Sequence, residues 1–248
     1  MANWNEPQST RTDFGAPGSF NGRTQGQAAT YDMGLRRYML SIYNYMASGV
    51  LLSGLVALLS ASSGLTQALF GTPLRWVVML APLGIVFAMG MGMQRMRTST
   101  LQMLFWAFSV LMGLSMSAIF VVYTGPSIAA TFFATAASFA GLSLVGYTTK
   151  KDLSAMGTFL SMGVIGLLVA MLINMFWPMP GLSLAISMLG VLIFAGLTAY
   201  DTQRLKLMYA QVAGSDMQGK VVVMGALTLY LDFINMFQFL LSFLGDRR

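Results

Sequence analysis

The sequence contains no cysteine and no histidine. Without cysteine there are no disulfides, no thiol catalysis and no thiolate metal sites. Without histidine the chain lacks the usual general base, the usual zinc ligand and the usual pH switch near neutrality. Charge is also scarce, at 9% of 248 residues, whereas soluble proteins carry roughly a quarter. An ordinary soluble enzyme is therefore not expected, and any pH-dependent behaviour must come mainly from carboxyl groups.

The charge that is present is mostly basic, with 14 Lys and Arg against 8 Asp and Glu. These cations are spread through a chain that is 56% hydrophobic, so they cannot form a phosphate-binding face. No nucleic-acid partner is expected. The composition instead indicates an all-α integral membrane protein whose main partner is the lipid bilayer.

Residues 1–35 differ from the rest, because they are rich in Gly, Ser, Thr, Asn and Gln and have no apolar run. We predict a disordered tail there and a membrane domain over 36–246. One bilayer crossing needs about 20 apolar residues, so the charge-free intervals 98–149 and 153–200 should each hold two helices, divided at Gly125-Pro126 and at 177–181. The prediction is seven membrane helices, near 38–60, 75–94, 100–123, 127–147, 155–176, 182–204 and 221–244.

The cations predict the orientation of these helices. Eleven of the 14 fall on the side that holds the tail and the loops after helices two, four and six. Such an excess marks the cytoplasmic side. The N-terminus is therefore expected in the cytoplasm and the C-terminus outside, in agreement with an odd number of helices. The remaining three cations are Arg75, Arg247 and Arg248.

Two acids within the apolar segments are the candidate functional residues. Asp232 is expected near the middle of helix seven, where an Asp costs about 3 kcal/mol to insert and normally faces the bundle interior. Asp201 is expected in the last turn of helix six, near the membrane boundary. Sequence neighbours often pack together, but a shared site would need a tilt or break in helix seven to offset this difference in depth. The simpler alternatives are an Asp201–Arg204 pair at a helix end and a structural Asp232 held by Thr228 and Asn235.

Two segments around these acids resemble the Bax inhibitor family of seven-helix membrane proteins. They are Ala199-Tyr200-Asp201-Thr202-Gln203 and Leu229-Tyr230-Leu231-Asp232-Phe233-Ile234-Asn235, with a looser match at Lys150-Lys151-Asp152-Leu153. The resemblance implies six helices surrounding a central helix seven, with Asp201 and Asp232 as a paired pH sensor. It also implies a basic partner at the end of helix two, for which Arg95 and Arg97 are both available. Some relatives carry an acid inside helix two, whereas residues 76–93 contain none.

The resemblance further implies a calcium-leak channel or transporter in a bacterial inner membrane. Two carboxylates a few ångströms apart in low dielectric cannot both ionise cheaply, so we expect the pair to share one proton and to gate the path, in a direction that the sequence leaves open. Ca²⁺ takes six to eight oxygens. The two acids with Thr198, Thr228 and Asn235 supply fewer, so we expect weak transient Ca²⁺ binding, no high-affinity metal site and no cofactor.

Two other functions are alternatives to transport. The family includes a protease-modulating branch, so the alternative is a non-transporting modulator that binds a membrane protease or another membrane complex. Paired acids on consecutive helices also occur in intramembrane aspartyl proteases, which carry Gly-x-Gly-Asp around the second acid. Here the four residues are Leu229-Tyr230-Leu231-Asp232, so no enzyme is expected. The permeant ion, the oligomeric state and the choice between Arg95 and Arg97 stay open at this point.

Overall fold

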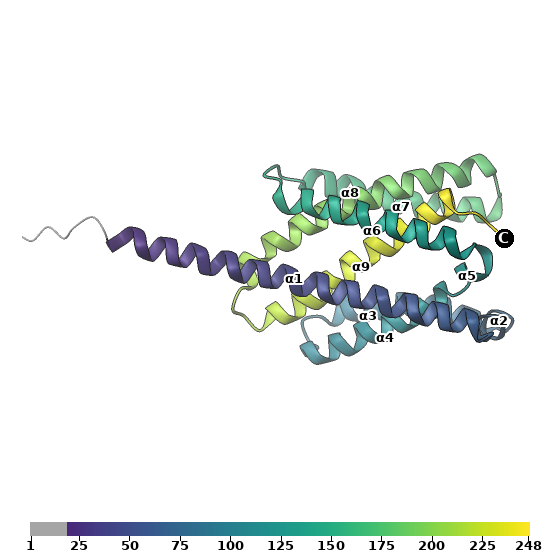
Figure 1. Cartoon of the computed structure of the whole chain (residues 1–248), viewed down its shortest axis with the longest axis horizontal. Coiled ribbons are helices and arrows are strands. Elements are labelled where there is room, and N and C mark those ends of the chain that lie inside the picture. The colour runs from purple at the N-terminus through teal and green to yellow at the C-terminus, as the bar shows by residue number, and fades with distance from the viewer. Residues whose placement is uncertain (1–18) are drawn as a thin grey trace, which may run out of the picture.

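Long runs of Leu, Met, Ala and Phe form helices here because a bilayer offers no water to the backbone, so each N–H and C=O must be bonded within its own segment. A computed structural model describes residues 19–248, with side chains from Thr30 onward. Over that range the chain contains helices and no strand (Figure 1). The helices are α1 (Ser19–Ser62), α2 (Leu65–Phe70), α3 (Leu74–Gly92), α4 (Thr98–Met116), α5 (Ile119–Val122), α6 (Gly125–Thr148), α7 (Ser154–Phe176), α8 (Pro180–Val212) and α9 (Met217–Leu244).

Seven segments of the described chain are long and apolar enough to cross a membrane. They are Thr30–Ser62 of α1, the whole of α3, α6, α7, α8 and α9, and Thr98–Val122, which combines α4 with the short α5. Large side chains on their outer faces are exposed in the isolated chain, as for Phe159 at 74% and Phe176 at 70%, where lipid would cover them. The predicted all-α membrane fold with seven spans is confirmed.

Two helix ends differ from the predicted ones. α1 begins at Ser19, before the expected tail boundary at residue 35; residues 1–18 of that tail lie outside the described residues. α8 continues to Val212, well beyond the expected end at 204. Charged residues end an apolar run but not a helix, since Arg, Lys, Leu, Met and Gln are all good helix formers. The chain leaves this helix at Gly214, whose φ of 72° is the left-handed conformation that glycine adopts after a helix.

The antiparallel helices α8 and α9 make the most extensive contact of the bundle. α9 also packs against α1, α4 and α6, and it is the most buried of the seven described spans. In Figure 1 it crosses between the group of α6, α7 and α8 and the group of α1, α3 and α4. α3 packs mainly on α4, and α7 on α8. A ring of six helices around a central seventh is therefore not confirmed.

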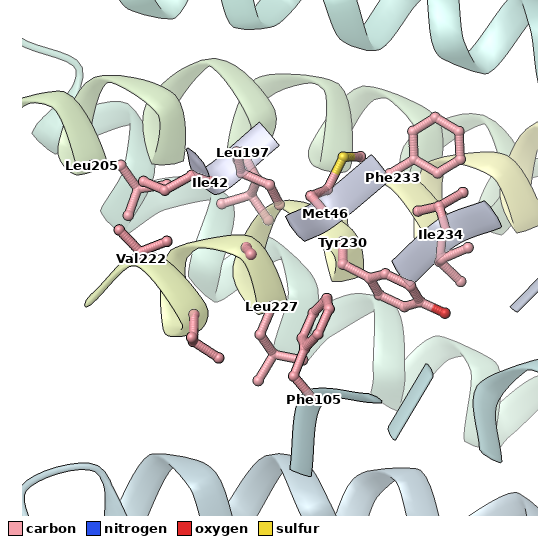
Figure 2. Close-up of a cluster of buried hydrophobic side chains, with 14 of the residues drawn as sticks. Ile42, Met46, Phe105, Leu197, Leu205, Val222, Leu227, Tyr230, Phe233 and Ile234 are labelled. Atoms are coloured by element: carbon pink, nitrogen blue, oxygen red, sulfur yellow. The ribbon is translucent and has the colours of Figure 1, made fainter. Parts of the chain in front are cut away.

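The apolar core lies where α9 meets its neighbours. Figure 2 shows this cluster, in which side chains from α1, α4 and α8 gather on α9. Tyr230 and Phe105 are fully buried in it, with their rings 6.3 Å apart and edge to face, a favourable aromatic geometry. The labelled residues are Ile42, Met46, Phe105, Leu197, Leu205, Val222, Leu227, Tyr230, Phe233 and Ile234.

The turns α3–α4, α6–α7 and α8–α9 lie at one end of the bundle, together with the start of the α1 span. Two hydrogen bonds tie this end together: Lys220 Nζ at the start of α9 donates to the Gln94 carbonyl (3.1 Å), and Lys206 Nζ of α8 donates to the Tyr147 carbonyl (2.7 Å). We call it the basic end, and the other the C-terminal end. The cations of the basic end are Arg36, Arg37, Arg95, Arg97, Lys150, Lys151, Arg204, Lys206 and Lys220.

Candidate functional site

Asp201 of α8 and Asp232 of α9 meet inside the bundle. Their carboxyl groups are close enough to interact with each other, and the two residues are only 8% and 4% exposed. The difference in depth between the two acids is smaller than predicted from the sequence, because α8 runs on to Val212. At 1.5 Å per residue, Asp201 lies about 17 Å before the end of α8, and Asp232 about 23 Å after the start of α9. The two heights differ by about one helical turn, so α9 needs no break.

The contact between these groups has a chemical requirement. An ionised carboxylate only accepts hydrogen bonds, so a hydrogen bond between two carboxyl groups needs a proton on one of them. Oδ2 of Asp232 is fully buried and receives no hydrogen bond from an N–H or hydroxyl of the described residues. A proton shared between the two carboxyl groups would meet this requirement, and the pair would then carry at most one negative charge.

The cation that acts on Asp201 is Arg204, one turn further along α8. Arg95 and Arg97 lie exposed at the α3–α4 turn, and within the described chain neither makes an ion pair with Asp201 or Asp232. Lys220, which is bonded to that turn, precedes Asp232 by about 18 Å of helix. A basic partner from the end of helix two thus stays a prediction.

The three polar residues expected to support the pair have other contacts. The Thr198 hydroxyl donates to the Phe194 carbonyl (2.8 Å), and the Thr228 hydroxyl donates to the Met224 carbonyl (3.1 Å), each within its own helix. Asn235 is half-buried and lines a cavity nearer the C-terminal end. Among the described contacts, none of the three donates to either carboxyl group.

A buried hydroxyl network that includes Tyr230 was not anticipated from the sequence. The Tyr230 hydroxyl of α9 is hydrogen-bonded to Ser53 Oγ of α1 (2.6 Å), and Ser53 Oγ also contacts the Ser109 carbonyl of α4 (2.7 Å). All three residues are buried. The sequence contains one indication of this network, which is the position of Tyr230 two residues before Asp232. A phenol hydroxyl in the middle of a membrane span needs a hydrogen-bond partner. The network joins α1, α4 and α9, and its residue on α9 is two positions before Asp232.

Removing one hydroxyl from this network should destabilise the protein modestly. We expect Ser53→Ala and Tyr230→Phe to be non-additive, with a coupling of about 0.6 kcal/mol and at most about 1.7 kcal/mol, the range for interhelical hydrogen bonds in membranes. A double-mutant cycle on unfolding in detergent measures this coupling. Ser48→Ala is the control, because Ser48 bonds only to carbonyls of its own helix. Strictly additive losses would contradict the network.

Gln203, two residues after Asp201, connects α8 to the α6–α7 turn, which contains the segment 150–153. Gln203 accepts a hydrogen bond from the Leu153 amide (2.9 Å) and donates to the Lys151 carbonyl (2.8 Å), so it holds the α6–α7 turn. Thr202 bonds Ser143 of α6 (3.3 Å). In the same turn, hydrogen bonds with Ser154 hold the pKa of the exposed Asp152 carboxyl below its ordinary value. One turn of α8 thus faces α9 with Asp201 and the α6–α7 turn with Gln203.

Two cavities lie toward opposite ends of the bundle, and neither is lined by Asp201 or Asp232 themselves. A cavity of about 340 Å³ at the basic end is lined by Tyr200, Gln203 and Arg204, which flank Asp201. A second, of about 510 Å³, lies toward the C-terminal end between α7, α8 and α9, and reaches Asn235, three residues after Asp232. Its further polar lining consists of Asn174, Ser183, Ser187, Gln238, Ser242 and Arg247. The carboxyl pair lies along α8 and α9 between these hollows.

Comparison with known proteins gives the same assignment as the residues around the pair. The family described as inhibitor of apoptosis-promoting Bax1 matches residues 35–248. A protein of Rickettsia prowazekii is 47% identical over 91% of this chain and 96% of its own length. Inner membrane protein YbhL of Escherichia coli is 43% identical over 87% of this chain and 94% of its own length. The chain therefore belongs to the Bax inhibitor family of multi-pass membrane proteins.

Proposed function

We propose that this protein is a proton-gated leak pathway for Ca²⁺ across a bacterial inner membrane. The observation that carries the proposal is the buried contact between Asp201 and Asp232, made inside a membrane-spanning bundle. A buried ionisable residue in a membrane helix normally faces an ion or proton path. Here two such residues from different helices compete for one proton.

The two cavities support passage of a cation past the pair. They lie toward opposite ends of the bundle and carry polar side chains, and an ion that passes from one to the other would cross the protein near the carboxyl groups. Two carboxyl groups offer fewer oxygens than the six to eight that Ca²⁺ takes. Binding completed by water would be weak, which suits conduction because a permeating ion must also leave. The choice of Ca²⁺ rests on the family resemblance.

The proposed gate is the contact between α8 and α9 at the pair. With one shared proton the two carboxyl groups hold the helices together. Loss of that proton places two negative charges side by side in low dielectric, with Arg204 as the nearest cation, and favours separation. The path should therefore open as the pH rises and close in acid. A latch between Arg95 or Arg97 and an aspartate would give the opposite dependence, because acid would then release it.

The proposed orientation places the basic end in the cytoplasm and the C-terminus outside. The inner-membrane name of the Escherichia coli relative supports the compartment. Since the chain has no cysteine, a single Cys in place of exposed Ser215, in the α8–α9 turn of the basic end, can be tested with a membrane-impermeant thiol reagent. Labelling in intact spheroplasts would contradict the orientation, and labelling only after lysis is expected.

The decisive experiment uses the full chain reconstituted in vesicles with an enclosed calcium dye. Ca²⁺ flux above that of protein-free vesicles should increase from about pH 6 to about pH 8. A flux that decreases over this range would contradict the carboxyl latch but not transport. No flux at any pH would contradict transport, and would favour the alternative of a modulator that acts by binding a membrane protease.

A further inference from the structure

An apolar groove of about 720 Å³ runs along the bundle between α1 and α6. The two helices are antiparallel, so Arg36 and Tyr147 mark its mouth at the basic end, while Leu51 and Phe132 mark its far end. Fifteen residues of each helix separate these points, a length of about 23 Å. Phe233 of α9 contributes to the lining.

The groove faces the surroundings of the membrane spans. Leu40, Leu51 and Leu144 on its wall are 50%, 61% and 63% exposed. A hollow with such a wall loses dispersion contacts if it is empty and gains nothing from water, because it offers few polar partners. The acyl chain of a neighbouring lipid is the occupant that a bilayer supplies.

The mouth of the groove is basic. Arg36 is exposed and, within the described chain, has no ion-pair partner. Lys206 of α8 lies beside the mouth, where its Nζ donates to the Tyr147 carbonyl and sits 4.9 Å from the Tyr147 ring. No acidic residue lines the groove. Basic pockets between membrane helices are suited to anionic headgroups.

We propose that this groove is a binding site for one anionic phospholipid, whose acyl chain lies between α1 and α6 and whose phosphate group contacts Arg36. The proposed lipid site does not depend on ion transport, so its test is independent of the test of the proposed gate. It lies directly behind that gate, because Phe233 follows Asp232, and Ser143 of the groove wall accepts a hydrogen bond from Thr202.

The headgroup contact is tested with the full chain in detergent, titrated with phosphatidylglycerol or phosphatidylcholine and followed by native mass spectrometry. Arg36→Gln should weaken retention of phosphatidylglycerol about fivefold, the effect of one cation near an anionic headgroup, and leave phosphatidylcholine unchanged. Arg37→Gln is the matched control, since Arg37 is an exposed neighbour of equal charge outside the groove. Equal losses in both variants would overturn the assignment of the headgroup to Arg36.

The acyl-chain contact is tested by filling the groove. Ala140→Phe places a ring in the groove, whereas Ala137→Phe places one at an exposed position of the same helix outside it. One retained lipid should be lost in the first variant and kept in the second. Lipid retention that is unchanged by Ala140→Phe would overturn the site. A dimer mass that appears with the wild-type protein and is lost with this variant would also overturn it, because the occupant of the groove would then be a second copy of the chain.

Discussion

Asp232→Asn is expected to remove the pH response of Ca²⁺ flux and to leave the flux low at every pH. Asn has nearly the same shape as a protonated Asp and never ionises, and its amide donates a hydrogen bond to Asp201. The latch between α8 and α9 is then permanently closed. If the latch is worth about 1.4 kcal/mol, within the range of interhelical hydrogen bonds, flux near pH 8 should fall about tenfold relative to the wild type.

Asp201→Asn should behave in the same way, because the shared proton belongs to the pair rather than to either residue. Asp232→Ala removes the hydrogen bond without a substitute, so its flux should be high and equally flat. The opposite directions of the Asn and Ala variants separate a latch from a simple loss of function. Asp216→Asn is the control, since Asp216 is exposed before the start of α9. A wild-type pH response in either Asn variant of the pair would contradict the sensor.

Gly146→Ala is expected to produce the largest loss of stability. At this position α6 approaches α8 so closely that a Cβ would overlap the carbonyl oxygen of Ala199. A backbone atom cannot rotate away as a side chain does, so the helices must separate. Overpacking of this kind costs about 1–3 kcal/mol and occasionally more. Because Ala199 is two residues before Asp201, the separation should also disturb the carboxyl pair.

Thermal unfolding in detergent measures the loss of stability, and flux near pH 8 reports the second effect. Gly141→Ala is the matched control, because a Cβ at this position of the same helix meets nothing within 4 Å. It should be neutral, or stabilising by up to about 1 kcal/mol through helix propensity. Equal stability of the two variants would show that the contact between α6 and α8 is not as tight as the structure has it.

The site was predictable from the sequence only in part. Asp201 and Asp232 could be identified because each interrupts an apolar segment. Inserting a carboxyl group into lipid costs free energy, so such residues in membrane helices usually have a function. Their difference in depth was overestimated, because the predicted end of helix six followed the first charges whereas α8 runs on to Val212. The roles of Ser53, Ser109 and Gln203 were missed, because each acts through a partner far along the chain.

The sequence by itself determined that this is a membrane protein, that it has seven spans, and which two carboxyl groups are the candidate functional residues. These properties depend on the length of apolar runs and on the cost of placing charge in lipid, and both are local. Only the tertiary structure decided that the two acids lie next to each other, that Arg204 is close enough to act on the charge of Asp201, and that a groove opens between α1 and α6. Those features depend on how each helix is rotated and against which neighbours it packs, which no single segment encodes.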